Sequence, residues 1–203
     1  DLVTGVNEAC GYTISAAGTG GGTVGSLTSL FASNNGGSNG GAVYFDITVG
    51  PTDLEVSEID INTDEGGSFT MDVYTIAGTY VGNETNQGAW TLATSASGTA
   101  TGTIDTPSNA VLDTPITLSA GTTYGMALVL DATHGHSYTN GDGTNQNFSN
   151  ADMSMSLGAA SNTPFTATIF SPRVFNGTIH YTTGAGSGLD FTCAELGENI
   201  IEV

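Results

Sequence analysis

The stretch Ala42-Val-Tyr-Phe-Asp-Ile-Thr-Val49 decides the fold class of this chain. Every second position from Val43 to Val49 is apolar, and Asp46 and Thr48 lie between apolar neighbours. This period of two predicts a β-strand with one buried face and one face toward solvent.

The same alternation recurs along the rest of the chain. In the segment 54–62 the phase slips at Ser57 and Glu58, which predicts a β-bulge. Gly50-Pro51 and the segments 64–67 and 140–143 are turn signals. The further predicted strands are 68–76, 89–94, 115–119, 122–131, 152–157, 165–170 and 173–182.

These segments predict an all-β protein, an antiparallel two-sheet β-sandwich of jelly-roll type. No window has helical periodicity. A parallel β-helix is the main alternative, but it requires a fixed repeat, and the sequence has none.

Three parts follow from the pattern. The strands define a sandwich domain over 42–183. Residues 1–41 combine an alternating apolar start, 1–14, with a glycine-rich stretch that costs entropy to order. We expect this segment to lie on its own domain or on a neighbouring subunit. Residues 184–203 form a tail that ends in apolar residues and is expected to add as a strand to a sheet edge.

The charge distribution excludes several partners. Arg173 is the single Lys or Arg against 20 acidic residues, and the formal net charge is -19. Such a surface cannot neutralise phosphates, so neither nucleic acid nor an anionic membrane is expected to bind. There is also no lysine for a phosphate-binding loop or a Schiff base. No run approaches the length of an apolar membrane span.

The composition and the two cysteines are typical of an extracellular protein. Only 10% of residues are charged, and hydroxyl and amide groups dominate the polar surface. The chain starts at Asp1 without a leader, so we expect a secreted or cell-surface protein whose signal peptide has been removed or was not included. Cys10 and Cys193 are expected to form a disulfide, which would contribute roughly 5 kcal/mol. Two buried thiols or a bridge between subunits are the alternatives.

Three segments resemble a recurrent domain of secreted bacterial proteins. They are SYTNGDGTNQNFSNADMSMSLGAA (137–160), FSPRVFNGTIHY (170–181) and AGTTYGMALVL (120–130). The resemblance covers roughly 42–182 and implies a cell-surface β-sandwich of unassigned activity. It carries no catalytic residues that can be transferred to this chain.

Two loops are candidate metal sites. Asn140, Asp142 and Asn145 offer the oxygen ligands that Ca²⁺ prefers, although the same residues also build turns through Asx hydrogen bonds. Asp64 and Glu65 form a second, less specific acidic turn. Calcium is therefore the one cofactor that the sequence suggests.

The histidines allow a different metal. His134 and His136 lie two residues apart after a predicted strand, and His180 lies on the last one. Together they would offer three nitrogens to zinc. Exposed loop histidines are the simpler interpretation.

Arg173 is expected to form a structural ion pair, with Asp152 as the first candidate partner. A ligand carboxylate or a sugar is the alternative partner for its guanidinium group.

Aromatic side chains could bind a glycan by stacking on a sugar ring. Trp90 and Tyr138 are the candidates, with Tyr80 beside them, and core packing is the alternative for Trp90. Asn83, Asn147 and Asn176 begin N-x-S/T sequons, which allow glycosylation.

Two functions remain open. The first is a non-enzymatic, extracellular structural or adhesive protein that assembles with copies of itself into a filament or surface layer through terminal strand addition. The second is a glycan-binding, calcium-assisted module of a larger secreted protein. The chain lacks a G-x-S-x-G nucleophile motif, and no enzymatic activity is expected.

Overall fold

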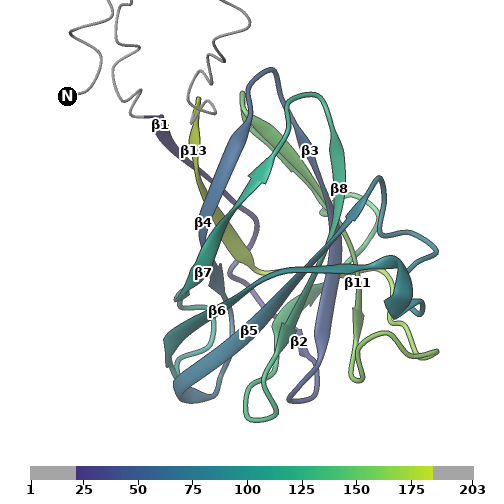
Figure 1. Cartoon of the computed structure of the whole chain (residues 1–203). Coiled ribbons are helices and arrows are strands. Elements are labelled where there is room, and N and C mark those ends of the chain that lie inside the picture. The colour runs from purple at the N-terminus through teal and green to yellow at the C-terminus, as the bar shows by residue number, and fades with distance from the viewer. Residues whose placement is uncertain (1–21, 185–203) are drawn as a thin grey trace, which may run out of the picture.

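The computed structural model describes residues 22–184, and this range is almost entirely β-structure (Figure 1). It contains one short 3₁₀ turn, η1 (Gln87–Ala89), and these strands: β1 (Thr23–Thr28), β2 (Asn35–Gly36), β3 (Ala42–Val49), β4 (Leu54–Ile61), β5 (Gly66–Ala77), β6 (Thr91–Thr101), β7 (Ser108–Leu118), β8 (Thr123–Leu130), β9 (Ser137–Asn140), β10 (Asn147–Ser149), β11 (Met153–Ser161), β12 (Arg173–Val174) and β13 (Gly177–Thr183). No helix within this range is long and apolar enough to cross a membrane.

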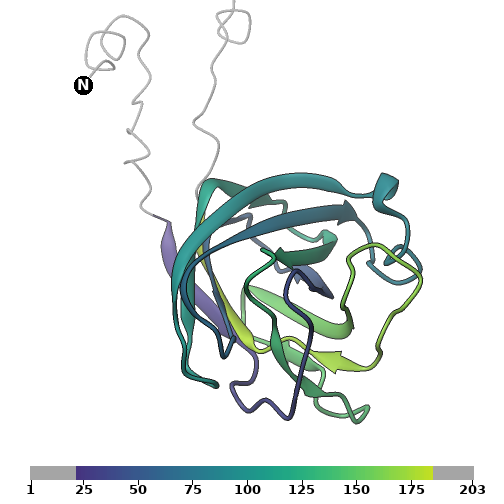
Figure 2. The same ribbon diagram turned by 90° about the horizontal axis from the view of Figure 1, so that it is seen from below.

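All neighbouring strands are antiparallel, which confirms the predicted all-β antiparallel class. Ten strands form one continuous sheet in the order β1-β13-β4-β7-β6-β5-β8-β3-β11-β10, and β12-β9-β2 form a small sheet. The large sheet curls until its two halves face each other (Figure 2). The two edge strands of this sheet, β1 and β10, lie close together. Asn150 Nδ2, directly after β10, donates a hydrogen bond to Ser26 O of β1 at 3.1 Å.

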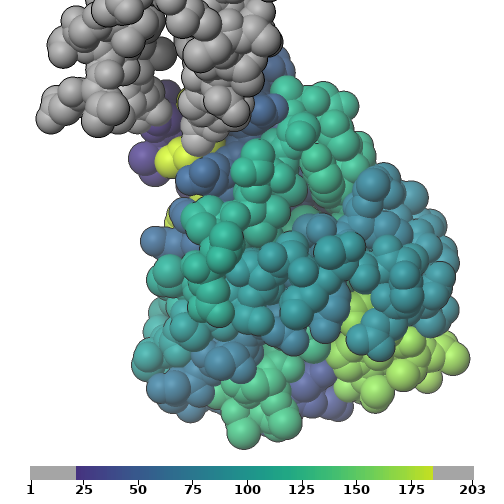
Figure 3. Space-filling view, viewed as in Figure 1, coloured from purple at the N-terminus to yellow at the C-terminus, as the bar shows by residue number. Residues whose placement is uncertain are grey.

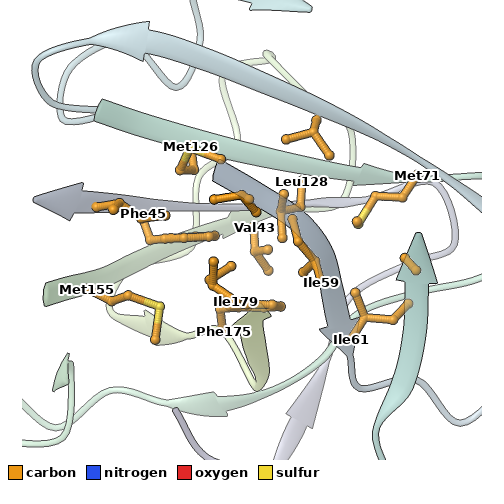
Figure 4. Packing of buried hydrophobic residues seen from close by; sticks show 14 of the residues in the cluster. Val43, Phe45, Ile59, Ile61, Met71, Met126, Leu128, Met155, Phe175 and Ile179 are labelled. Carbon is orange, nitrogen blue, oxygen red and sulfur yellow. The ribbon is translucent and has the colours of Figure 1, made fainter. Parts of the chain in front are cut away.

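One apolar core fills the space inside the curled sheet. Val43 of β3, Ile59 of β4 and Ile179 of β13 converge there (Figure 4). The rings of Phe45 and Phe175 stack in parallel, with centroids 5.2 Å apart. Burying a side chain of this size stabilises the fold by roughly 1.5–3 kcal/mol, so the core supplies the main driving force.

A second, smaller cluster lies on the outer face of β3 and β8. Tyr44, on that face, contacts Trp90 from the β5–β6 connection and Phe165 from the β11–β12 connection, with ring centroids 6.0 Å apart in both cases. The Tyr44 hydroxyl also accepts a hydrogen bond from Phe165 N. Two long connections therefore cover this face, which explains why Tyr44 is buried although it alternates with the core residues.

Several predicted strands have the expected boundaries. The strand 42–49 coincides with β3, and the bulge in 54–62 is confirmed by a register shift between Val56 and Glu58 in the pairing of β4 with β7. The segment 165–170 differs. Only Phe170 makes a bridge, to Ala160, and Phe165 has a left-handed φ of 58° because the segment bends over the outer cluster.

The glycine-rich end packs on its own domain within the described range. β1 pairs with β13 from Thr23↔Thr183 to Thr28↔Thr178, so residues 23–28 belong to the main sheet. Gly25 permits this pairing, since a Cβ there would lie 2.6 Å from the Tyr181 ring. Residues 1–21 and 185–203 lie outside the described residues, and with them Cys10 and Cys193, so the disulfide stays a prediction.

Candidate functional site

A pocket of about 420 Å³ opens between four segments near β2. Its walls come from residues 33–37, 64–65, 104 and 135–137. This volume is within the range of small-molecule sites, roughly 300–1,000 Å³. The pocket therefore has room for a small ligand.

The buried Asn62 and the partly exposed Asp105 fix one wall of the pocket. Asn62 Oδ1 accepts a hydrogen bond from Asp105 N at 2.8 Å, and Asn62 Nδ2 donates to Asp105 Oδ1 at 2.9 Å. Asp105 Oδ1 also accepts from Ser33 N at 2.8 Å. These bonds join the turn that carries Ile104 to the 33–37 segment, so the two walls are held at a fixed separation.

Glu65, which also lines the pocket, is held in a defined position. One of its oxygens accepts hydrogen bonds from Thr63 Oγ1 at 2.5 Å and from Gly135 N at 3.2 Å. Burial alone would raise the pKa of Glu65, but these hydrogen bonds favour the charged form and lower it below its usual range. The pocket therefore has an ionised carboxylate at neutral pH, beside exposed Asp64.

Among the described residues, the buried Nδ1 atom of His136 has no hydrogen-bond partner. His136 is 3% exposed, and its Nε2 lies 3.1 Å from Leu128 O. Because a carbonyl only accepts, Nε2 carries the proton and Nδ1 has a lone pair to offer. Burial lowers the pKa of His136 to about 4, so the ring is neutral. Buried polar atoms without a partner are uncommon and require an explanation.

The predicted calcium loop is a hydrogen-bonded turn. Asp142 Oδ1 accepts from Thr144 N, Thr144 Oγ1 and Asn145 N, while Asn145 Oδ1 accepts from Asp142 N. Asn140 Oδ1 accepts from Asn35 Nδ2. The oxygens proposed as ligands therefore bind groups of the protein itself, which is the Asx-turn alternative.

The three histidines do not form a common site. His134 Nδ1 lies 3.0 Å from Asp131 Oδ1, and His180 Nε2 lies 2.8 Å from Asp60 Oδ2. His136 instead faces Leu128 O, as described above. Across residues 22–184, no three His, Cys, Asp or Glu side chains come together as a metal-binding group.

The predicted ion pair between Arg173 and Asp152 is not formed. The Arg173 guanidinium lies 5.6 Å from the Tyr138 ring centroid and 5.8 Å from that of Phe170, and it donates a hydrogen bond to Pro172 O. Asp152 instead accepts a hydrogen bond from the Tyr181 hydroxyl at 2.9 Å. Cation–π contacts therefore replace the predicted carboxylate partner of Arg173.

The aromatic side chains proposed to stack on sugars are buried. Trp90 is 8% exposed and Tyr138 is 3% exposed. Trp90 Nε1 donates to Asn83 O at 2.9 Å within the outer cluster. Tyr80 is 9% exposed and packs in the same cluster. None of the three rings offers an open face to a ligand, so core packing is the better interpretation.

The sequons differ in access. Asn147 is exposed on β10 and Asn83 is partly exposed, whereas Asn176 is buried beneath the sheet. A glycan on Asn176 would require the surrounding structure to open.

A second feature of functional interest is a split in the large sheet. β6 and β7 pair only over Ala96–Gly98 and Ala110–Leu112 and then diverge (Figure 1). Beyond this point β6 remains bonded to β5 on one side and β7 to β4. A hydrogen bond from Thr114 N to Thr94 Oγ1 is the next contact across the split. On the side that faces the split, residues 91–93 of β6 and 115–118 of β7 therefore have no strand partner in the described structure.

Sequence reasoning located part of the pocket and missed the rest. It identified the Asp64-Glu65 turn, as an ordinary acidic turn or a less specific metal site, and it named His136 as a possible zinc ligand. It did not identify Ser33, Asn62 or Ile104, and it placed residues 33–37 only within the glycine-rich segment.

A scan of protein-family models and a search of curated proteins each gave no match to this chain. The resemblance to secreted bacterial surface domains therefore remains an expectation based on the quoted segments.

Proposed function

We propose that this chain is a non-enzymatic, extracellular structural or adhesive protein that assembles with copies of itself by strand addition. The split between β6 and β7 carries the proposal, because strand edges without partners are templates for another chain. A terminal segment of a second copy, residues 1–14, would occupy this edge. Backbone hydrogen bonds would provide most of the affinity, so a chain almost devoid of cations can use this mode.

The acceptor edge has apolar side chains beside it. Leu92, in the part of β6 that does not pair with β7, is 50% exposed, and Val111, in the adjoining part of β7 that pairs with β6, is 52% exposed. The space-filling view shows β5, β6 and β7 together on one accessible face of the molecule (Figure 3). An added strand would cover part of this apolar surface, which favours its binding.

Charge should oppose this assembly. Each copy has a formal net charge of -19, so approaching copies repel each other at low ionic strength. Salt screens this repulsion, and we expect longer assemblies at 0.5 M NaCl than at 20 mM NaCl. Negative-stain electron microscopy of the same preparation in both buffers measures the difference.

Two variants test the donor and the acceptor separately. Deletion of residues 1–14 should leave folded particles that no longer polymerise. Leu92→Lys in the full chain should also prevent polymerisation, because it places a charge on the acceptor edge. Val81→Lys is the matched control, since Val81 is 60% exposed in the β5–β6 connection, away from the split. Normal polymerisation of the Leu92→Lys variant would show that the acceptor lies elsewhere.

The alternative function, a glycan-binding and calcium-assisted module, gains less support. Its proposed stacking residues, Trp90 and Tyr138, are buried, and its proposed calcium loop uses its oxygens in internal hydrogen bonds. Self-assembly is therefore the function that we favour.

A further inference from the structure

We propose that the pocket between residues 33–37, 64–65, 104 and 135–137 binds a neutral, hydroxyl-rich molecule of about the size of one sugar ring. This proposal does not depend on self-assembly, because the pocket and the β6–β7 split are formed by different residues.

The two carboxylates of the pocket favour a ligand that donates hydrogen bonds. The carboxylates of Asp64 and Glu65, which line the pocket, only accept hydrogen bonds when ionised. Hydroxyl groups on adjacent carbons of a sugar ring would supply several donors at once to these two carboxylates.

One wall provides an apolar contact. Ile104 is 50% exposed although it is a large hydrophobic residue, and it lines the pocket together with polar groups. The carbon face of a sugar ring could pack on this side chain while its hydroxyls face the carboxylates. The Asn62–Asp105 hydrogen bonds hold the Ile104 turn in place before a ligand arrives, so little ordering entropy is lost on binding.

Charge selects against acidic ligands. No Lys or Arg lines the pocket, and its carboxylates would repel a carboxylate, sulfate or phosphate group on the ligand. A divalent cation is the other occupant that carboxylates could attract. However, the described residues contain no cluster of three acidic or histidine side chains to hold one. A neutral polyhydroxylated ligand therefore fits the pocket better than an anion or a metal ion.

Saturation-transfer NMR on the full chain tests this proposal, since it works on single particles and on assemblies. The probes are D-glucose, D-galactose, D-mannose and myo-inositol, with D-glucuronate as the acidic counterpart and CaCl₂ as the cation. We expect saturable transfer to at least one neutral probe, and about tenfold weaker binding of D-glucuronate than of D-glucose if glucose is the probe that binds. Absence of transfer to all four neutral probes, or displacement of a bound neutral probe by CaCl₂, would overturn the proposal.

Variants then assign the binding to this pocket. Glu65→Gln and Ile104→Ala should each weaken binding of the neutral probe by about tenfold, the first by removing a charged acceptor and the second by removing the apolar wall. Asp113→Asn is the matched control, because Asp113 is an exposed carboxylate on β7 outside the pocket. Thermal melting verifies that each variant is folded. If Ile104→Ala is folded and binds like the wild type, the site is not this pocket.

Discussion

Asn62 and Asp105 hold each other through two reciprocal hydrogen bonds, 2.8 and 2.9 Å long, although 42 residues separate them in the sequence. Asn62 is fully buried, and Asp105 has a left-handed φ of 61°. Left-handed backbone is unfavourable for a residue other than glycine, so this pair maintains a turn that would otherwise relax.

Asn62→Ala should therefore lower the free energy of unfolding by about 2–3 kcal/mol, because it breaks both bonds at a fully buried side chain and removes the partner of the Asp105 backbone amide. Urea denaturation measures the change. Asn86→Ala is the control, since the Asn86 side chain is exposed and makes no cap hydrogen bond. Its effect should stay within about 0.5 kcal/mol. Similar values for the two variants would contradict a structural role of the pair.

Gly158 and Tyr80 form a second close pair. A Cβ on Gly158 would overlap the Tyr80 hydroxyl, which lies directly against the β11 backbone. Gly158→Ala should destabilise the protein by about 1–3 kcal/mol through overpacking. Tyr80→Phe removes the overlapping oxygen, so the double variant should recover part of this loss, with a coupling energy of about 1 kcal/mol. Strictly additive effects in a double-mutant cycle would exclude this contact as the cause.

His136 should make stability depend on pH. Burial lowers its pKa to about 4, against 6.5 for the ordinary side chain, so the unfolded chain binds this proton more tightly than the folded one. The stabilisation linked to His136 is therefore fully present above pH 6.5 and decreases as the pH falls toward 4. Below pH 4 it is lost completely, and the free energy of unfolding has then decreased by about 3 kcal/mol. Glu65, whose pKa is also lowered, adds a loss of the same sign at lower pH.

Urea denaturation at pH 7, 6, 5 and 4 measures this dependence, and an NMR titration of the His136 ring gives the pKa directly. His136→Gln removes the titrating group while keeping a donor for Leu128 O. Between pH 7 and pH 4 the free energy of unfolding of this variant should decrease by about 3 kcal/mol less than that of the wild type. A His136 midpoint near 6.5 would contradict the burial argument.

The disulfide predicted from the sequence has a test of its own. Thr23 and Thr183 are register partners in β1 and β13, 13 residues after Cys10 and 10 residues before Cys193, so the chain is long enough for the two cysteines to meet. We expect no free thiol in the oxidised monomer and roughly 5 kcal/mol lower stability on reduction. Mass spectrometry under non-reducing conditions distinguishes this bridge from one between subunits.

The sequence predicted the strands better than their environment. The alternation in 42–49 and the phase slip in 54–62 are local signals, and both have direct counterparts in β3 and in the bulge at Val56/Glu58. Phe165 and Trp90 are different. Their burial depends on two connections that close over Tyr44, and no local pattern reveals that contact.

The pocket was only partly predictable for the same reason. Its acidic turn was recognisable, but the partners of that turn come from the 33–37 segment, from Ile104 and from His136, which are distant in sequence. Arg173 shows a related limit. A sequence rich in carboxylates suggested a salt bridge, whereas the packing of β12 against β9 placed the guanidinium over Tyr138. Composition therefore predicted the kind of surface, and long-range topology decided the contacts.

The pairing of Thr23 with Thr183 has a mechanical consequence. The described chain enters and leaves at the same end of two neighbouring antiparallel strands, so tension applied at residues 22 and 184 would load their hydrogen bonds one after another. Two strands loaded in this way separate one hydrogen bond at a time, at low force. A filament of these domains would therefore resist stretching only if the pull bypassed this junction, through a covalent clasp or through bonds between subunits.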